Sequence, residues 1–316
     1  MKNVVITGCA GFVGSWICEK ALKENYNVIG IDNLSSNVNY TPKDVDFYNL
    51  DVNSDITNIL NKADAIVHAS AYAELRHNWD NPLQREKLFY NNEMATRNVL
   101  ENMPDVPIIF LSSASVYGSL SLKEKEIALT EDKAVPELCE SPYAASKLAC
   151  EAYVATWAFK KKIPWYSLRL VNQVGARSHR GVITDFAKMV NEKNHIHAAD
   201  NGQQRKNWVS VEDTAEAIIY LLKSYQNTPS GIYNVTSDER WSWKDIVCIM
   251  KEVYIEKNPE CKNIFTLTHE DKIAGSIGDP INLYVSGEKL KKYFNCERSV
   301  EKSVRDALNF INWGSK

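Results

Sequence analysis

Two side chains at helical spacing, Tyr143 and Lys147, could carry proton-transfer chemistry in this 316-residue chain. They belong to the segment YAASK after Pro142, and a helix starting there places them on one face. A phenol has an ordinary pKa of about 10 and is a poor base at neutral pH. An ammonium one helical turn away favours the phenolate, which can then accept a proton from a hydroxyl group. Such pairs also occur on plain surface helices, so this interpretation needs support from the rest of the chain.

The first fourteen residues, MKNVVITGCAGFVG, predict a phosphate-binding turn between a strand and a helix. A β-branched run indicates a buried strand, and three glycines then lead into a helix expected over 12–24. Free backbone N–H groups at the start of such a helix attract a pyrophosphate. Gly8 would allow the tight turn, Gly11 the close approach of phosphate, and Gly14 the packing of helix on strand. The predicted cofactor contacts in this turn are Gly8, Gly11, Phe12, Val13 and Gly14.

An acidic residue, Asp32, ends the second expected strand about twenty residues past the glycines. Its carboxylate can accept both hydroxyls of an adenosine ribose and repels a 2′-phosphate, which predicts NAD rather than NADP. Strands expected over 45–50 and 64–68 end beside it at the same edge of the sheet. The other predicted cofactor contacts are Asn33, Ser35, Asp51, Val52, Ala69, Ser70, Ala71 and Asn92, together with Tyr143 and Lys147.

Strands and helices alternate along the chain. Further strands are expected over 106–111, 164–170 and 231–235, with helices over 83–103, 142–162, 182–194, 214–225, 243–254 and 301–311. This order predicts an α/β protein with a Rossmann-type doubly wound parallel sheet and a smaller mixed α/β C-terminal part. Hydroxyl residues in SSASVYG, at 112–118, follow the fifth strand where such a sheet binds its ligand.

The composition excludes several classes of protein. Apolar residues make up 44% and charged residues 24%, as in ordinary soluble proteins, and the net charge of −3 offers no basic surface for nucleic acid or a membrane. Seven cysteines without a C-x-x-C pair favour reduced thiols, so we expect a cytoplasmic protein. His195 and His197 have no partner cluster in the sequence, and we expect no metal site.

Six motifs taken together resemble the extended short-chain dehydrogenase/reductases. Within them, the chain is similar to the NAD-dependent sugar-nucleotide epimerases and dehydratases, and most of all to UDP-glucose 4-epimerase-like members. The motifs are GCAGFVG at 8–14, DNLSS at 32–36, SSASVYG at 112–118, YAASK at 143–147, LRLVNQVG at 168–175 and NWVSVEDTA at 207–215.

The resemblance implies a catalytic set of Ser113, Tyr143 and Lys147, with the serine bonded to the reacting oxygen. Lys147 would also reach the nicotinamide ribose of NAD. Ala114 and Ser115 stand where dehydratases of the family carry an acidic pair, which disfavours dehydration. The implied function is 4-epimerisation of a nucleotide sugar. The sugar would be oxidised at C4 to a 4-keto intermediate, and the hydride would return to the other face from a tightly held NAD.

The expected substrate contacts are Ser115, Asn172, Arg205 and Lys206. Two positions depart from the family, because Lys206 and Ser276 stand where arginines usually hold the diphosphate. The diphosphate could instead be held by Arg177, Arg180 or Arg205, or the substrate could differ. The loop 76–79 could also contact the substrate.

The resemblance implies an NAD-binding Rossmann domain over 1–171, to which 207–235 contributes, and a substrate-binding domain over 172–206 and 236–316. It also implies a homodimer, formed through a four-helix bundle of the helices near 83–103 and 142–160. The alternatives are an NAD(P)-dependent 4-keto nucleotide-sugar reductase, a dehydrogenase of a non-nucleotide alcohol, and a binding protein that keeps only the dinucleotide site.

Overall fold

The computed structural model describes residues 2–36, 38–40, 43–73, 81–118, 127–199, 202–259, 266–270 and 282–311. The loop 76–79 and Ser276, for which the sequence suggested substrate contacts, lie outside the described residues. No helix among the described residues is long and apolar enough to cross a membrane.

A seven-stranded sheet forms the larger layer, in the order β10-β6-β5-β4-β1-β2-β3, and every neighbouring pair is parallel. The order reverses between β1 and β4, which places a crevice at their carboxyl ends. The strands read as short β-branched runs because both faces of the sheet are covered. They are β1 (Asn3–Thr7), β2 (Asn27–Asp32), β3 (Asp46–Asn49), β4 (Ala65–His68), β5 (Ile108–Ser113), β6 (Trp165–Leu170) and β10 (Gly231–Val235).

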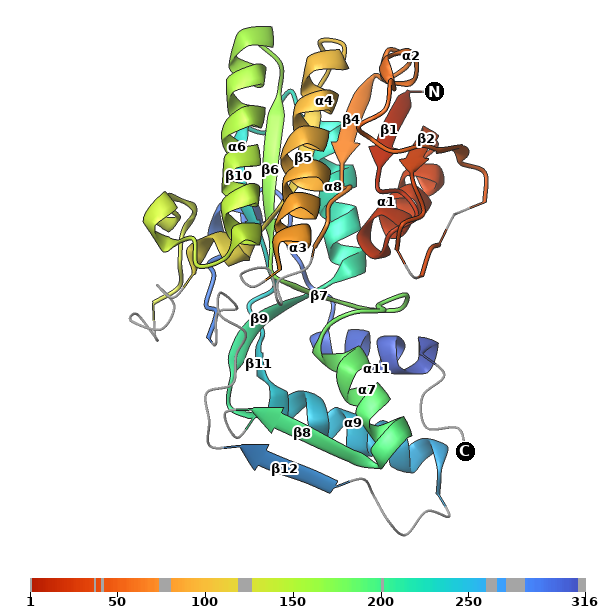
Figure 1. Ribbon diagram of the computed structural model, residues 1–316, viewed down its shortest axis with the longest axis vertical. Helices are drawn as coiled ribbons and strands as arrows, with labels where there is room; N and C mark the ends of the chain where they lie inside the picture. Colours follow the sequence, from red (N-terminus) through yellow and green to blue (C-terminus); the bar gives the residue numbers. More distant parts are fainter. Residues whose placement is uncertain are drawn as a thin grey trace.

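Helices cover this sheet on both sides (Figure 1). On one face α1 (Phe12–Lys23) and α8 (Val211–Ser224) pack together, with Ile17 and Ile218 in their shared core. On the other face α2 (Thr57–Leu60), α4 (Ala95–Asn102) and α6 (Pro142–Lys161) bury a second core that includes Val99 and Val154. The predicted Rossmann-type doubly wound sheet is therefore confirmed.

A smaller mixed part follows the sheet. In it β9 pairs parallel with β7 and antiparallel with β11, while β12 pairs parallel with β8. Three helices pack around these strands and share a core that contains Phe186, Met250 and Val304. The elements are β7 (Asn172–Val174), α7 (Val182–Lys193), β8 (His195–Ala199), β9 (Arg205–Ser210), β11 (Arg240–Ser242), α9 (Trp243–Lys257), β12 (Thr266–Glu270) and α11 (Val300–Phe310).

Some boundaries differ from the sequence prediction. Residues 207–210 lie in β9 of the smaller sheet, so the chain returns to the large sheet only with α8 and β10. The helix expected over 83–103 is divided by a π-helical segment, because i→i+5 hydrogen bonds replace the α pattern there. Its parts are α3 (Pro82–Leu88), the π segment η1 (Phe89–Met94) and α4. The remaining short helices are η2 (Ala114–Tyr117), η3 (Glu131–Lys133), η4 (Pro136–Leu138) and α10 (Glu288–Lys291).

Candidate active site

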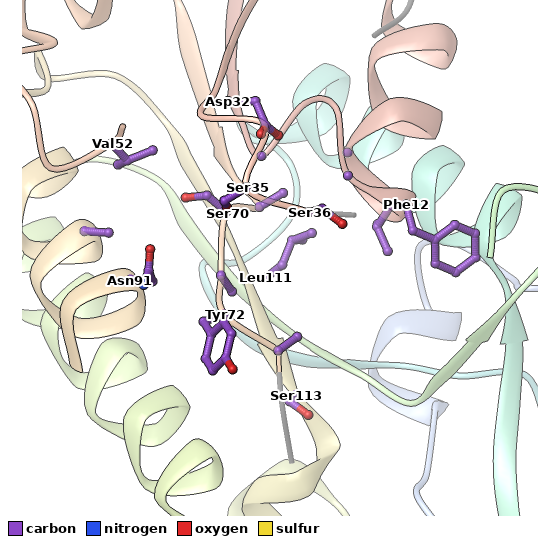
Figure 2. A pocket seen from close by; sticks show the side chains of 18 of the residues that line it. Phe12, Asp32, Ser35, Ser36, Val52, Ser70, Tyr72, Asn91, Leu111 and Ser113 are labelled. Atoms are coloured by element: carbon purple, nitrogen blue, oxygen red, sulfur yellow. The ribbon is translucent and has the colours of Figure 1, made fainter. Parts of the chain in front are cut away.

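A cavity of about 550 Å³ opens at the carboxyl ends of β1, β2, β4 and β5, where the strand order reverses. Figure 2 shows its walls, with Asp32, Ser70 and Ser113 coming from three different strand ends. Every predicted cofactor and catalytic residue except Asn92 lines it. These residues are Gly8, Gly11, Phe12, Val13, Gly14, Asp32, Asn33, Ser35, Asp51, Val52, Ala69, Ser70, Ala71, Ser113, Tyr143 and Lys147.

The glycine turn leaves no space for side chains at two positions. Gly8 has φ +70°, and a Cβ there would meet the backbone N of Ser70 at 2.6 Å, so β1 and the end of β4 lie in close contact. A Cβ on Gly14 would come within 1.9 Å of the Gly8 carbonyl oxygen, which fixes α1 against the turn. No side chain caps α1 at Gly11, and its first turn carries no acidic residue. The N-terminus of α1 therefore suits a phosphate.

Asp32 and Asp51 are held rigidly at the other end of the cavity. Asp32 accepts the N–H of Ala10 on one oxygen at 3.0 Å and that of Leu34 on the other at 2.8 Å. Asp51 accepts the Asn33 side-chain amide at 2.9 Å. Each carboxylate oxygen of Asp32 keeps a lone pair for a ligand hydroxyl. Together with the glycine turn, this donor and acceptor set fits a dinucleotide with a free ribose diol.

The sequence places Tyr143 and Lys147 through the start of α6. Ser141 caps the helix by accepting the N–H of Ala144 at 3.1 Å, and Pro142 occupies the first turn. Tyr143 is buried and hydrogen-bonded with Ser113, and burial raises its pKa to about 12. The three predicted catalytic residues are thus brought together on one wall of the cavity.

The contacts and the pKa of Lys147 show how the surroundings of this pair differ from those that the sequence predicts. Its Nζ donates to the Leu111 carbonyl at 2.8 Å and lies 4.8 Å from the ring centre of Phe110 and 6.0 Å from that of Tyr143. Burial lowers the pKa of Lys147 to about 8. The sequence predicts a lowered phenol pKa, but in this structure burial raises the pKa of Tyr143, and the phenol is protonated at neutral pH.

A buried ion pair lies beneath the catalytic residues and was not anticipated from the sequence. Glu151, one turn after Lys147 on α6, accepts the Ser112 hydroxyl at 2.6 Å. It also accepts Nε and Nη2 of Arg169 at 2.9 and 2.8 Å. Arg169 in turn donates to the Tyr117 hydroxyl at 3.0 Å. This network joins β5, β6 and α6 directly behind Ser113.

Asn92, predicted as a cofactor contact, lies outside the cavity lining. Its amide oxygen accepts the N–H of Tyr72 at 2.8 Å, and its nitrogen donates to Ser146 at 3.0 Å. The neighbouring Asn91 lines the cavity instead. The π segment adds a residue to the turn, which changes the face that each asparagine presents. Asn92 therefore stabilises the cavity wall through these hydrogen bonds and does not itself line the cavity.

The four predicted substrate residues also lie outside the lining. The Ser115 hydroxyl is buried and has no hydrogen-bond partner among the described residues. The Asn172 amide donates to the Asn207 carbonyl at 3.1 Å, and Lys206 is buried on β9. Arg205 is exposed, with its guanidinium 4.0 Å from Asp245. On one strand, Arg205 and Lys206 point to opposite faces.

Several lining residues were not found from the sequence as cofactor contacts. Lys87 and Asn91 come from α3 and η1, and Gln173 comes from β7. His179 and Arg180 follow β7. The sequence suggests Arg180 only as one of three arginines that could hold the diphosphate of the substrate. Gln173 lies in the LRLVNQVG motif at 168–175, but no short motif marks the other positions.

Comparison with known proteins gives the family. The family model of the NAD dependent epimerase/dehydratase family matches residues 4–236. A putative UDP-glucose 4-epimerase of Methanocaldococcus jannaschii is 30% identical over 78% of this chain and 81% of its own. A solved UDP-galactose 4-epimerase has a TM-score of 0.80 at 25% identity, and it covers 98% of both chains.

A second solved structure has a closely similar fold. The UDP-glucuronic acid 4-epimerase of Bacillus cereus, in complex with UDP-glucuronic acid and NAD, has a TM-score of 0.84. It is 22% identical and covers 98% of both chains. The glycine turn, the Asp32 carboxylate and the match over 4–236 agree on one cofactor. The chain belongs to the NAD dependent epimerase/dehydratase family, and its cofactor is NAD.

Proposed function

We propose that the protein is a nucleotide-sugar 4-epimerase, which oxidises the sugar transiently at C4 and reduces the 4-keto intermediate on its other face. The observation that carries the proposal is the meeting of Ser113, Tyr143 and Lys147 on the cavity wall that NAD fits. The relatives named UDP-glucose 4-epimerase support the same reaction.

The residues of this chain would move a proton at the sugar hydroxyl. As the phenolate, Tyr143 takes that proton, and Ser113, which hydrogen-bonds with Tyr143, would also hold the sugar oxygen that loses it. When bound, NAD supplies a reversible hydride acceptor beside the sugar. Lys147 supplies a buried positive charge one helical turn from Tyr143, and this charge favours the deprotonated phenol. The raised pKa of Tyr143 makes this help necessary at neutral pH.

Dehydration is disfavoured by the groups that line the cavity. Of the described lining residues, only Asp32 and Asp51 carry a carboxyl group, and both accept backbone N–H groups. Ala114 and Ser115 follow Ser113 and offer no acid–base pair to expel water. Hydride return without elimination is the chemistry that remains.

We infer that the nucleotide sugar lies between an NAD-binding domain and a substrate-binding domain. The first would comprise 1–171 with the returning segment of 207–235, and the second 172–206 with 236–316. The orphaned hydroxyl of Ser115 would bond the sugar, while Asn172 and Lys206 would face the nucleotide part. Lys206 would hold the diphosphate as a point charge rather than as a bidentate clamp.

A homodimer is part of this proposal. The helices α3, η1 and α6 carry large apolar side chains that are exposed in the single chain, and a second copy would cover them in a four-helix bundle. These residues are Leu83, Phe89, Tyr90, Met94, Tyr153 and Phe159. Light scattering of the wild type and of a Phe159→Lys, Phe89→Lys double variant tests this. A wild-type monomer would contradict it.

The reaction is tested by incubating the purified protein with UDP-, dTDP- and GDP-sugars and following the C4 configuration by NMR. The expected result is a mixture of the two C4 epimers without added NAD. Net consumption of added NADH or NADPH with a 4-keto sugar would identify a reductase instead. A product that has lost water would identify a dehydratase. No reaction and no binding of any nucleotide sugar would overturn the proposal.

A further inference from the structure

The segment between β7 and α7 carries three basic side chains, Arg177, His179 and Arg180, at the junction of the two parts of the chain. Two of them, His179 and Arg180, line the NAD cavity together with the glycine turn. Neither belongs to a motif that the fold or the catalytic chemistry requires. Their partners show what the segment can do.

Arg177 anchors the segment to the outside of α1. Its guanidinium pairs with Glu19, lies 4.4 Å from the ring centre of Trp16 and reaches the Ser15 hydroxyl at 3.4 Å. Trp16 in turn donates to the Ala176 carbonyl at 3.0 Å. Arg177 has φ +73°, and this left-handed residue turns the chain back toward the cavity. Arg177 is therefore structural and is not available to a ligand.

His179 joins the segment to the loop that follows β2. Its Nε2 is 3.2 Å from the Ser36 hydroxyl, and its Nδ1 is 3.4 Å from the Arg177 carbonyl. Burial is the main cause that lowers the pKa of this imidazole, so it is neutral at neutral pH. Because a carbonyl only accepts, Nδ1 carries the proton and Nε2 accepts from Ser36. The bond joins the two parts of the chain, and both of its residues line the cavity.

Arg180 is left at the rim of the cavity, one residue past this bond. Its side chain is exposed, and no carboxylate of the described residues lies within 4.0 Å of it. Phe12 and Val13, at the start of α1, line the same cavity, and no side chain caps the helix there. Figure 2 shows Phe12 and Ser36 on the same side of the cavity. A diphosphate at the start of α1 would thus face a free guanidinium.

We propose that the 175–181 segment is a clasp over the cofactor, in which Arg180 binds the diphosphate of NAD and the His179–Ser36 hydrogen bond holds the clasp shut. A guanidinium binds phosphate oxygens through charge-assisted and bidentate hydrogen bonds. The clasp slows NAD release and keeps the cofactor in place between turnovers. This inference extends the proposed function. It rests on that function, because a 4-epimerase needs to keep its NAD bound between turnovers.

The test measures NAD release directly from the full-length protein, by trapping dissociated NAD after rapid dilution. Arg180→Ala should speed release about tenfold or more, and Arg180→Lys should fall between that variant and the wild type. Lys188→Ala is the matched control, since this exposed lysine lies nearby on α7 and does not line the cavity. It should release NAD at the wild-type rate. His179→Ala should speed release less than Arg180→Ala does.

A second measurement distinguishes the two diphosphates that Arg180 could bind, that of NAD and that of the nucleotide sugar. UDP affinity of the NAD-loaded protein is measured by calorimetry for the wild type and Arg180→Ala. Equal UDP affinities with faster NAD release support the clasp. Unchanged NAD release with weaker UDP binding would overturn it and assign Arg180 to the substrate, and no change in either would also overturn it. Both readouts are independent of catalysis, so the clasp can fail while epimerisation stands, or the reverse.

Discussion

The Ser112 hydroxyl donates a 2.6 Å hydrogen bond to Glu151, and this contact ties the strand that carries Ser113 to the helix that carries Lys147. Glu151 is 3% exposed and also pairs with the buried Arg169. Lys147 donates a hydrogen bond to the carbonyl of Leu111, the residue before Ser112. The Ser112–Glu151 contact therefore lies next to Ser113 on the strand and one turn from Lys147 on the helix. The Glu151–Arg169 ion pair does not line the cavity. It holds the strand of Ser113 against the helix of Tyr143 and Lys147.

Glu151→Gln should destabilise the fold strongly. The variant leaves the Arg169 guanidinium buried without a counter-charge, which costs about 3–5 kcal/mol. Ser112→Ala is the control, because it removes one hydrogen bond and should cost only about 1–2 kcal/mol. Urea unfolding of both variants gives the comparison. Equal losses in the two variants would mean that the Arg169 pair adds nothing beyond the Ser112 contact.

Tyr143→Phe should abolish turnover and leave NAD bound. It removes the proton acceptor, and positioned acid–base groups of this kind contribute about a hundred- to ten-thousandfold in rate. The ring still fills its buried site, so the cofactor content after gel filtration should match the wild type. Tyr26→Phe, at a half-buried position on the far side of α1, is the control for activity. Loss of NAD from Tyr143→Phe would show that the tyrosine has a different role.

His68 makes stability depend on pH below neutrality. Burial is the main cause that lowers its pKa to about 3, and its ring bonds with the hydroxyls of Thr7 at 2.7 Å and Thr96 at 3.0 Å. The unfolded chain has a histidine pKa of about 6.5 and so binds one more proton than the folded chain between these values. The free energy of unfolding should therefore fall with decreasing pH from about 6.5 toward 3, by at most ~1.4 kcal/mol per pH unit.

The contribution of His68 is isolated by comparing urea unfolding at pH 7, 6 and 5 for the wild type and His68→Gln. The variant should show a flatter dependence on pH. His197→Gln, at an exposed position on β8, should follow the wild type. Parallel curves for the wild type and His68→Gln would show that the imidazole is not kept neutral by the fold.

Gly14→Ala should disrupt the cofactor turn. The added Cβ would lie 1.9 Å from the Gly8 carbonyl oxygen, so α1 must move away from the turn. Overpacking of this kind costs about 1–3 kcal/mol or more, and the displaced helix N-terminus should bind NAD weakly. Gly11→Ala is the graded control, because its Cβ would meet the same oxygen at 3.3 Å. Thermal melting and NAD titration test both; equal stability losses would contradict the packing argument.

The cofactor half of the site follows from the sequence because it is local. Gly8 and Gly14 are set by the geometry of one strand–turn–helix, and Asp32 ends the next strand. Tyr143 and Lys147 share a face through helical periodicity alone. Short-range rules fix each of these positions, and the structure places all five in one cavity.

Asn92 shows where local rules fail. The sequence predicts one regular helix over 83–103, whereas the structure has a π segment there, and Asn91 rather than Asn92 lines the cavity. The pKa of Tyr143 is another case, because the sequence shows the nearby Lys147 but not the burial that raises the pKa of the phenol. Periodicity cannot reveal either a change of helix type or a desolvation penalty.

By itself the sequence determined the doubly wound sheet, the NAD turn and the side chains that we propose as catalytic, since these depend on residue order and spacing. Only the tertiary structure decided which residues from distant parts of the chain contact one another around the site. Glu151 meets Ser112 across 39 positions, and His179 meets Ser36 across 143. Contacts at such separations arise from the packing of sheet, helices and crossing segments, and no local pattern in the chain encodes them.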